Sequence, residues 1–501
     1  MTTSYVIIIL IVYFGILFII SRLSVKNADS KTFFIANRNA PWPLVAYGMI
    51  GVAISGITFI SVPGQVAETQ FSYFQMVLGF AIGLFIVAFV LVPIFYRINA
   101  ISIYSFLKIR FGKFTHKTGA IFFLVAQVAT ASFKLYLMAH VLQLLLFDRI
   151  GISFEITVLI TLLLIWLYTY RGGIQTVILT DTLQTTFLLL AVILSIWSIS
   201  RQMNLSVGDM YAQMQENNLA KVFYWNWDHP QNFFKLILAG ILLTVMTNGL
   251  DQSVMQKHLT CRNLKSSQKN IVSLGVILLG VNILFLFLGG ALNLFGTQEN
   301  VTLPEQTDSI YPVMALNNLG LLTGTFFLIG IAAAAYSSAD SSLTGLTTSF
   351  CVDVLNFEDR ETDDTRLRQG VHFGFTVLIY IIILIFNLIN NESVLSAFIR
   401  TSGFIYGPLV GLFAFGIFTK KIIDDRWVPL ISILAPVLSV ILDINSADWF
   451  NGYKFGYGIL VVNSLIALAG LYLLSFLTPK SYKQYKKDLV EKVHWKKNLN
   501  D

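Results

Sequence analysis

The chain has 501 residues, of which 55% are hydrophobic and only 12% are charged. A soluble domain of ordinary composition carries about 25% charged residues, so the composition argues against a soluble protein. The formal net charge of +7 does not indicate a nucleic-acid partner, because the lysines and arginines are distributed as membrane topology requires. The composition therefore predicts an integral membrane protein.

About thirteen apolar stretches are long enough to cross a membrane as helices. In chain order they cover residues 4–21, 42–62, 73–97, 119–147, 153–170, 178–200, 233–256, 270–296, 321–350, 370–390, 394–418, 427–443 and 455–477. The first lacks a basic segment before it and a small-residue cleavage site after it, so we expect a span rather than a cleaved signal peptide. The sequence predicts an all-α membrane domain over residues 1–480 and a basic cytoplasmic tail over residues 481–501.

Basic residues follow the odd-numbered spans and are scarce after the even-numbered ones. Arg22, Arg97 and Lys257 are examples from three of the basic connections. Because positively charged loops stay in the cytoplasm, this bias predicts an external N-terminus and a cytoplasmic C-terminus. Cys261 and Cys351 then lie in or beside segments on the cytoplasmic side, where we expect reduced thiols.

Two spans carry helix-breaking residues near their middle. The second reads GMIGVAISGITFISVPG over residues 48–64, and the seventh reads LLTVMTNGLDQ over residues 242–252. Glycine weakens a helix by about 1 kcal/mol per site, and small hydroxyls can cap the freed backbone groups. These spans begin two successive groups of five, which predicts an inverted-repeat transporter with its site near the midplane. The alternative is close helix packing through small residues.

Residues 330–344 read GIAAAAYSSADSSLT, so hydroxyls and a carboxylate lie between small residues inside an apolar span. Hydrocarbon penalises an unsatisfied hydroxyl, and we expect this cluster to face something polar inside the protein. Hydroxyl and carboxylate oxygens are hard ligands that suit a small cation such as Na⁺. A cation-coordinating helix in a membrane protein indicates transport.

Five motifs together resemble the sodium/solute symporter family, whose members carry sugars, proline, pantothenate, iodide or sialic acid. The motifs are ISGITFISVPG at 54–64, YRGGIQTVILTDTLQT at 170–185, GLDQSVMQKHL at 249–259, AAYSSADSS at 334–342 and SGFIYGPLVGLF at 402–413. The resemblance covers residues 1–480 and implies a leucine-transporter-type fold in the cell membrane that works by alternating access. Its five-plus-five inverted repeat would occupy about residues 42–200 and 233–418.

The resemblance also implies a principal Na⁺ site between the second and ninth spans. Backbone carbonyls would come from Gly51, Ile54 and Ala334, and hydroxyls from Ser337 and Ser338. The alternative is that both serines hydrogen-bond back to their own helix.

Some family members hold a second Na⁺ nearer the cytoplasm, beside an aspartate that follows a GG turn. Asp181 matches that aspartate, and Ser337, Asp340 and Ser341 would complete the site. An intramembrane carboxylate is costly and usually functional, which suits a cation site. The alternative is that one carboxylate is protonated or paired with a basic residue.

The solute is expected to lie between the two interrupted spans. The candidate solute-binding residues are Ser55, Thr58, Gln75, Lys134, Thr247 and Gln252. Lys134 lies in the middle of the fourth span. The resemblance implies that its position is close to that of an arginine with which the sialic acid members bind the substrate carboxylate, and that Ser55 and Thr58 match the hydroxyls that assist this arginine. The alternative is that Lys134 pairs with an internal carboxylate such as Asp181.

We therefore expect Na⁺-coupled symport of an anionic carboxylate such as a sialic acid, with a neutral sugar or polyol as the second reading. Na⁺, the solute and the bilayer are the expected partners of a monomer, with no nucleic acid. An enzyme is disfavoured, because the six histidines form no ligand-spaced pair and no G-x-S-x-G or H-E-x-x-H motif occurs. A Na⁺-permeable channel remains a further alternative. A second intramembrane cation, Arg400, suggests either an outer anion site or a side chain that reaches the interface.

Overall fold

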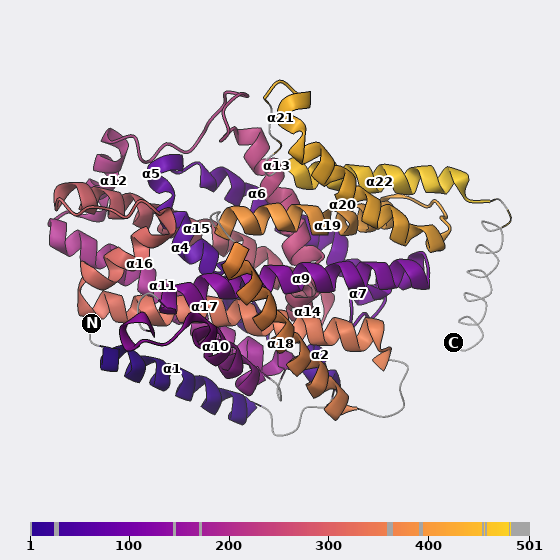
Figure 1. Ribbon diagram of the computed structural model, residues 1–501, viewed down its shortest axis with the longest axis horizontal. Coiled ribbons are helices and arrows are strands. Elements are labelled where there is room, and N and C mark those ends of the chain that lie inside the picture. The colour runs from indigo at the N-terminus through magenta and orange to yellow at the C-terminus, as the bar shows by residue number, and fades with distance from the viewer. Residues whose placement is uncertain are drawn as a thin grey trace.

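The computed structural model describes residues 3–24, 30–143, 147–169, 173–357, 364–389, 394–452, 455, 458–479 and 481. Within this part of the chain the regular structure is helical, apart from one isolated bridge between Ala40 and Cys261. The helix α1 lies along one edge of the bundle and α20 and α22 along another, with α9, α11 and α17 between them (Figure 1).

Ten helices among the described residues are long and apolar enough to cross a membrane, or up to twelve if each of two bent pairs counts as one span. The ten are α1 (Thr3–Ser24), α6 with α7 (Tyr73–Ile86 and Val92–Arg97), α9 (Lys113–Leu142), α11 (Gly173–Met203), α15 (Leu264–Gln298), α17 (Gly320–Ser349), α18 (Thr365–Ile389), α19 (Val394–Phe418), α20 (Val428–Ile444) and α22 (Ile459–Leu477). The fifth predicted stretch, residues 153–170, corresponds to the shorter apolar helix α10 (Phe154–Thr169). Each predicted stretch thus overlaps a helix.

Shorter elements join these helices. They are α2 (Ser30–Ile35), α5 (Val66–Thr69), α8 (Ser105–Arg110), α12 (Val207–Glu216), α16 (Thr307–Asn317) and α21 (Ser446–Trp449).

The two bent pairs are the two spans that the sequence predicts to be interrupted. The first consists of α3 (Trp42–Ala53) and α4 (Gly56–Gly64), with a bend of 56°. The second consists of α13 (Phe233–Thr244), a π-helical turn η5 (Val245–Gly249) and α14 (Gln252–Leu259), with a bend of 68°. The breaks fall at Ile54–Ser55 and at Leu250–Asp251, where the backbone leaves the helical conformation. The bends therefore confirm broken helices at matching places in the two predicted repeats.

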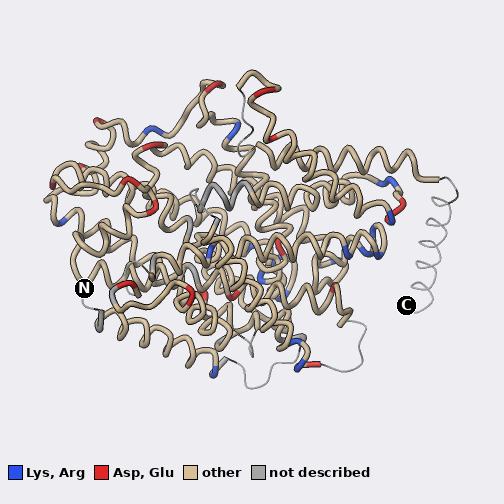
Figure 2. Tube along the Cα trace, viewed as in Figure 1, with Lys and Arg blue, Asp and Glu red and all other residues tan. Residues whose placement is uncertain are grey.

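Charged residues mark the ends of the helices rather than their middles. Figure 2 shows Lys and Arg gathered mainly at the right-hand end of the bundle, where α9 begins and α22 ends, while the long middle stretches are mostly uncharged. Lys257 is an exception. The sequence predicts it in a basic cytoplasmic loop, and this is wrong, because Lys257 lies in α14 and its side chain is only 1% exposed. The two cysteines are buried and form no disulfide.

The helices α6 and α13 meet through a pair of glycines. A Cβ atom on Gly240 would overlap the carbonyl oxygen of Met76 and lie 3.1 Å from the Cα atom of Gly79. A Cβ atom on Gly79 would likewise lie 3.0 Å from the Cα atom of Gly240. Small residues let helix backbones approach this closely in a membrane, where van der Waals packing holds helices together.

We expect Gly240→Val to lower the thermal midpoint of the purified protein, because overpacking a tight contact costs about 1–3 kcal/mol. Gly280→Ala on α15 is the matched control, since a Cβ atom there would meet nothing within 4 Å. Equal midpoints for the two variants would show that the α6–α13 contact does not limit stability.

Candidate functional site

A cavity of about 220 Å³ lies between the two bent helices. Its wall includes Ser55 and Thr58 from the first bend, Thr247 and Asp251 from the second, and Lys134 from α9. Because helix ends at the bends expose backbone groups and the wall carries both charges and hydroxyls, this cavity can bind a polar solute and a small cation.

The first bend contains two of the backbone carbonyls that the sequence predicts as Na⁺ ligands. No hydrogen bond among the described residues uses the carbonyl of Gly51 or of Ile54, the last residues before the break. The N–H of Gly51 donates to Thr185 Oγ1 of α11 at 3.0 Å, which holds this end of α3 in place. Ile54 lines the cavity, so its part of the backbone is next to the space that a cation would enter.

The helix α17 supplies hydroxyls on the facing side. Ser338 lines the cavity, and its buried hydroxyl has no hydrogen-bond partner among the described residues. Ser337 Oγ donates to Asp181 Oδ1 at 2.5 Å rather than to its own helix. In contrast, Ser341 and Ser342 donate back to the carbonyls of Ser337 and Ser338. Hydrogen bonding back to the same helix therefore occurs at Ser341 and Ser342, one turn later, and not at Ser337 or Ser338 among the described contacts. The hydroxyl oxygens of Ser337 and Ser338 keep lone pairs that can act as acceptors. Ala334, the fifth predicted ligand, is buried one turn earlier on α17.

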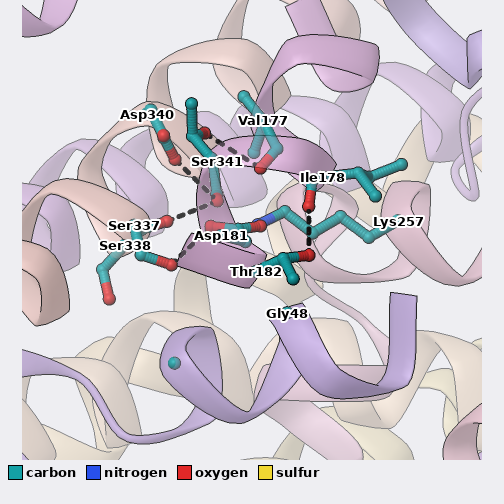
Figure 3. A network of polar contacts seen from close by, with 12 residues as sticks. Gly48, Val177, Ile178, Asp181, Thr182, Lys257, Ser337, Ser338, Asp340 and Ser341 are labelled. Atoms are coloured by element: carbon teal, nitrogen blue, oxygen red, sulfur yellow. Dashed lines mark hydrogen bonds and ion pairs between the residues drawn. The ribbon is translucent and has the colours of Figure 1, made fainter. Parts of the chain in front are cut away.

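Asp181 pairs with Lys257 and not with Lys134, so one carboxylate of the predicted second site is paired with a basic residue, as the alternative for that site stated. The internal carboxylate near Lys134 is Asp251 instead. The Oδ2 atom of Asp181 accepts from Lys257 Nζ at 2.5 Å, and both side chains are almost fully buried. Figure 3 shows the Lys257 chain reaching Asp181 from one side, while Ser337 contacts it from the other and Ser338 points away. The ammonium group therefore lies at the carboxylate that the second Na⁺ was predicted to use.

The rest of the predicted second site lies on the next turn of α17. Asp340 is fully buried, and Ser341 Oγ donates to its Oδ1 at 3.1 Å as well as to the carbonyl of Ser337 at 2.6 Å. Ser341 lines the cavity.

Lys134 and Asp251 share the cavity. Each contributes an electrostatic interaction to the other, so the nearby carboxylate for Lys134 comes from the second bend. Asp251 is held by the N–H and hydroxyl of Ser253 and by the hydroxyl of Tyr406. Sequence reasoning used Asp251 only as part of a break, although an aspartate at a helix interruption was a signal for a site residue.

The predicted solute-binding residues fall into two groups. Ser55, Thr58, Lys134 and Thr247 line the cavity, whereas Gln75 and Gln252 are absent from its wall. The Gln75 amide bonds to the backbone at Gln231 and Tyr224, and the Gln252 amide bonds to the backbone at Ile101 and Ile103. Both amides are buried and bonded to backbone groups. The Arg400 side chain lies outside the described residues.

No group of three or more His, Cys, Asp or Glu side chains suited to a metal ion occurs in the described part of the chain. Hydroxyls and carbonyls are hard oxygen ligands that suit Na⁺, and they are the donor types at the first bend and on α17. Residues 33–425 match the sequence profile of the sodium:solute symporter family. The chain belongs to this family.

Two curated relatives resemble this symporter over most of its length. The sodium/sialic acid symporter NanT of Aliivibrio fischeri is 25% identical over 470 residues, which cover 91% of this chain and 89% of NanT. The sodium/sialic acid symporter SiaT of Proteus mirabilis is 22% identical over 459 residues, which cover 89% of each chain.

Solved structures confirm the leucine-transporter-type fold of this symporter. A Na⁺-coupled sialic acid symporter in a substrate-bound outward-open state matches with a TM-score of 0.81 at 19% identity, covering 96% of this chain and 98% of that one. Mhp1, a nucleobase-cation-symport-1 family transporter, matches with a TM-score of 0.56 at 14% identity, covering 89% and 95% of the two chains.

Family membership shows which class of protein this is. The protein is a multi-pass symporter of the cell membrane that couples a small-molecule solute to Na⁺, and it is a transporter rather than an enzyme. Neither the solute nor the residues that bind it follow from membership alone.

Proposed function

We propose that this symporter carries a sialic acid or a similar anionic carboxylate together with Na⁺ by alternating access. The observation that carries the proposal is the Lys134 ammonium group in the wall of the cavity between the two bent helices. A cation inside the membrane domain is costly and marks a site for an anionic partner. The printed names of NanT and SiaT, both sodium/sialic acid symporters, support the same solute class.

The other cavity residues suit the remainder of such a solute. Ser55 and Thr58 would donate to the carboxylate oxygens beside Lys134, while Thr247 and Asn248 at the second bend would bond to hydroxyl or amide groups. Lysine contacts a carboxylate as a point charge, whereas arginine would form two parallel hydrogen bonds. Lys134 therefore permits several carboxylates, and the surrounding hydroxyls select among them. Gln75 and Gln252 would need to leave their backbone partners to contribute.

Na⁺ would bind beside this solute. Its ligands in the proposal are the carbonyls of Gly51, Ile54 and Ala334 and the hydroxyls of Ser337 and Ser338. Support comes from the carbonyls at the first bend and the Ser338 hydroxyl at the cavity wall, which have no hydrogen-bond partner in the described part of the chain. We further propose a monomer in the bilayer, with its N-terminus outside and its C-terminus in the cytoplasm.

A neutral sugar or polyol is the second candidate, and one observation favours it. Asp251 lines the same cavity as Lys134 and interacts with it electrostatically, so a carboxylate of the protein already offsets the ammonium charge. A solute without charge would then meet a nearly neutral pair and a set of hydroxyls.

The proposal is tested by uptake into proteoliposomes. We expect labelled sialic acid to accumulate when a Na⁺ gradient points inward, and not when K⁺ replaces Na⁺ on both sides. Unlabelled carboxylates should compete with it more strongly than neutral hexoses. Na⁺-driven uptake of a neutral sugar without uptake of any carboxylate would instead establish the second candidate.

A further inference from the structure

The strongest observation outside the solute cavity is the charge pair between α11 and α14. Asp181 sits in the spanning helix α11, and its two oxygens accept from Ser337 and from Lys257. The side chains of the pair are 1% and 2% exposed. A buried carboxylate next to a turn with Ser337, Asp340 and Ser341 is a group of hard oxygens that suits a small cation.

We infer that the ammonium group of Lys257 is a built-in cation that replaces a second coupling Na⁺, so that this symporter couples transport to a single Na⁺. The inference extends the proposed function, because it sets the ion stoichiometry and takes the principal Na⁺ site as given.

Distance and space favour this reading. The separation of 2.5 Å between Lys257 Nζ and Asp181 Oδ2 leaves no room for an ion between them. The helix α3 closes another side, since a Cβ atom on Gly48 would come within 2.9 Å of Asp181 Cβ. A second Na⁺ would have to displace the ammonium or lie beside it, where the two positive charges repel.

The chain also holds Lys257 in place. Its neighbour Gln256 bonds to the carbonyl of Phe34 and to the hydroxyl of Thr348, and Asn270 contacts the ring of His258. All of these side chains are buried. Because both neighbours are fixed, Lys257 of α14 is directed at Asp181 of α11. A helix of the second predicted repeat thus supplies the ammonium group that pairs with a carboxylate of the first predicted repeat.

The pair also affects the principal Na⁺ site through Ser337. A hydroxyl has one hydrogen and two lone pairs, and Ser337 gives its hydrogen to Asp181. Its lone pairs then remain available as acceptors, next to Ser338, which lines the cavity. Lys257 donates to the other oxygen of Asp181 and so fixes this carboxyl group as the acceptor for Ser337. In this way Lys257 orients a ligand of the principal site from a distance.

The test is an equilibrium count of bound ²²Na⁺ on purified full-length protein, without any solute. We expect the wild type to bind one Na⁺ per protein with a Hill coefficient of one. Lys257→Ala should bind two, because the freed carboxylate and the vacated space admit an ion. Lys257→Ala combined with Asp181→Asn should return the count to one. Lys235→Ala, which removes a lysine from the outer part of the same bent span, is the matched control and should leave the count at one.

The outcomes separate this inference from an ordinary structural ion pair. A wild-type count of two would overturn it, and so would a count that stays at one in Lys257→Ala. If Lys257→Ala does not fold, Lys257→Ser, which also removes the ammonium and keeps Asp181, takes its place and should bind two, and a count of one there would overturn the inference. A wild type that binds none, with a Lys257→Ala that binds one, would refute the principal Na⁺ site and support the built-in cation.

Discussion

Replacing Ser337 and Ser338 together by alanine will raise the half-saturating Na⁺ concentration for uptake by on the order of 100-fold. The two hydroxyls supply two of the five proposed oxygen ligands. A hydrogen bond to a charged group contributes about 1.5–3 kcal/mol, and each 1.4 kcal/mol changes a binding constant about tenfold. The single change Ser338→Ala should have a smaller effect confined to Na⁺, because its hydroxyl has no other partner among the described residues.

The measurement is the Na⁺ dependence of initial uptake rates in proteoliposomes. Thr325→Ala is the matched control, since it removes a hydroxyl from the same helix α17 that donates to Leu321 rather than facing the cavity. Thr325 is twelve residues from Ser337, which is about 18 Å along the helix. Unchanged Na⁺ dependence in the double variant would refute the principal site.

Lys134→Met will abolish uptake of the carboxylate solute while leaving Na⁺ binding intact. Lys134 lies in the cavity wall, and a hydrogen bond to a charged group contributes about 1.5–3 kcal/mol, so a solute carboxylate that accepts from the ammonium gains much of its affinity there. We expect affinity to fall by roughly 100-fold or more, whereas Lys134→Arg should retain transport because it keeps the charge. Lys113→Met, at the exposed start of the same helix α9, is the control and should behave as the wild type.

The charge of the solute can be tested without any variant. Calorimetry with a sialic acid and with its methyl ester compares two ligands that differ in one negative charge. We expect much weaker binding of the ester. Equal affinity would show that Asp251 already neutralises Lys134, and it would move the neutral sugar or polyol ahead as the solute.

Local sequence was sufficient to predict the framework. Apolar stretches of membrane length each overlap a helix, because the bilayer requires a continuous run of apolar side chains wherever a helix faces lipid. The breaks at Ser55 and Asp251 were also predictable, since glycine and small polar residues weaken a helix wherever they occur together. The motif at 334–342 placed the hydroxyls on α17 for the same reason: its chemistry lies in consecutive residues.

Only the tertiary structure decided which polar groups meet. Lys257 was assigned to a basic loop because it follows an apolar span, yet it is buried against Asp181, which lies 76 residues away in the sequence. Gln75 and Gln252 were predicted to face the solute, but the fold directs their amides to distant backbone groups. A buried charge or amide must find a partner, and that partner is set by the packing of helices far apart in the chain. The sequence by itself therefore determined the family, the spans and the breaks, while the pairing of Lys257 and the place of Asp251 beside Lys134 depended on the packed helices.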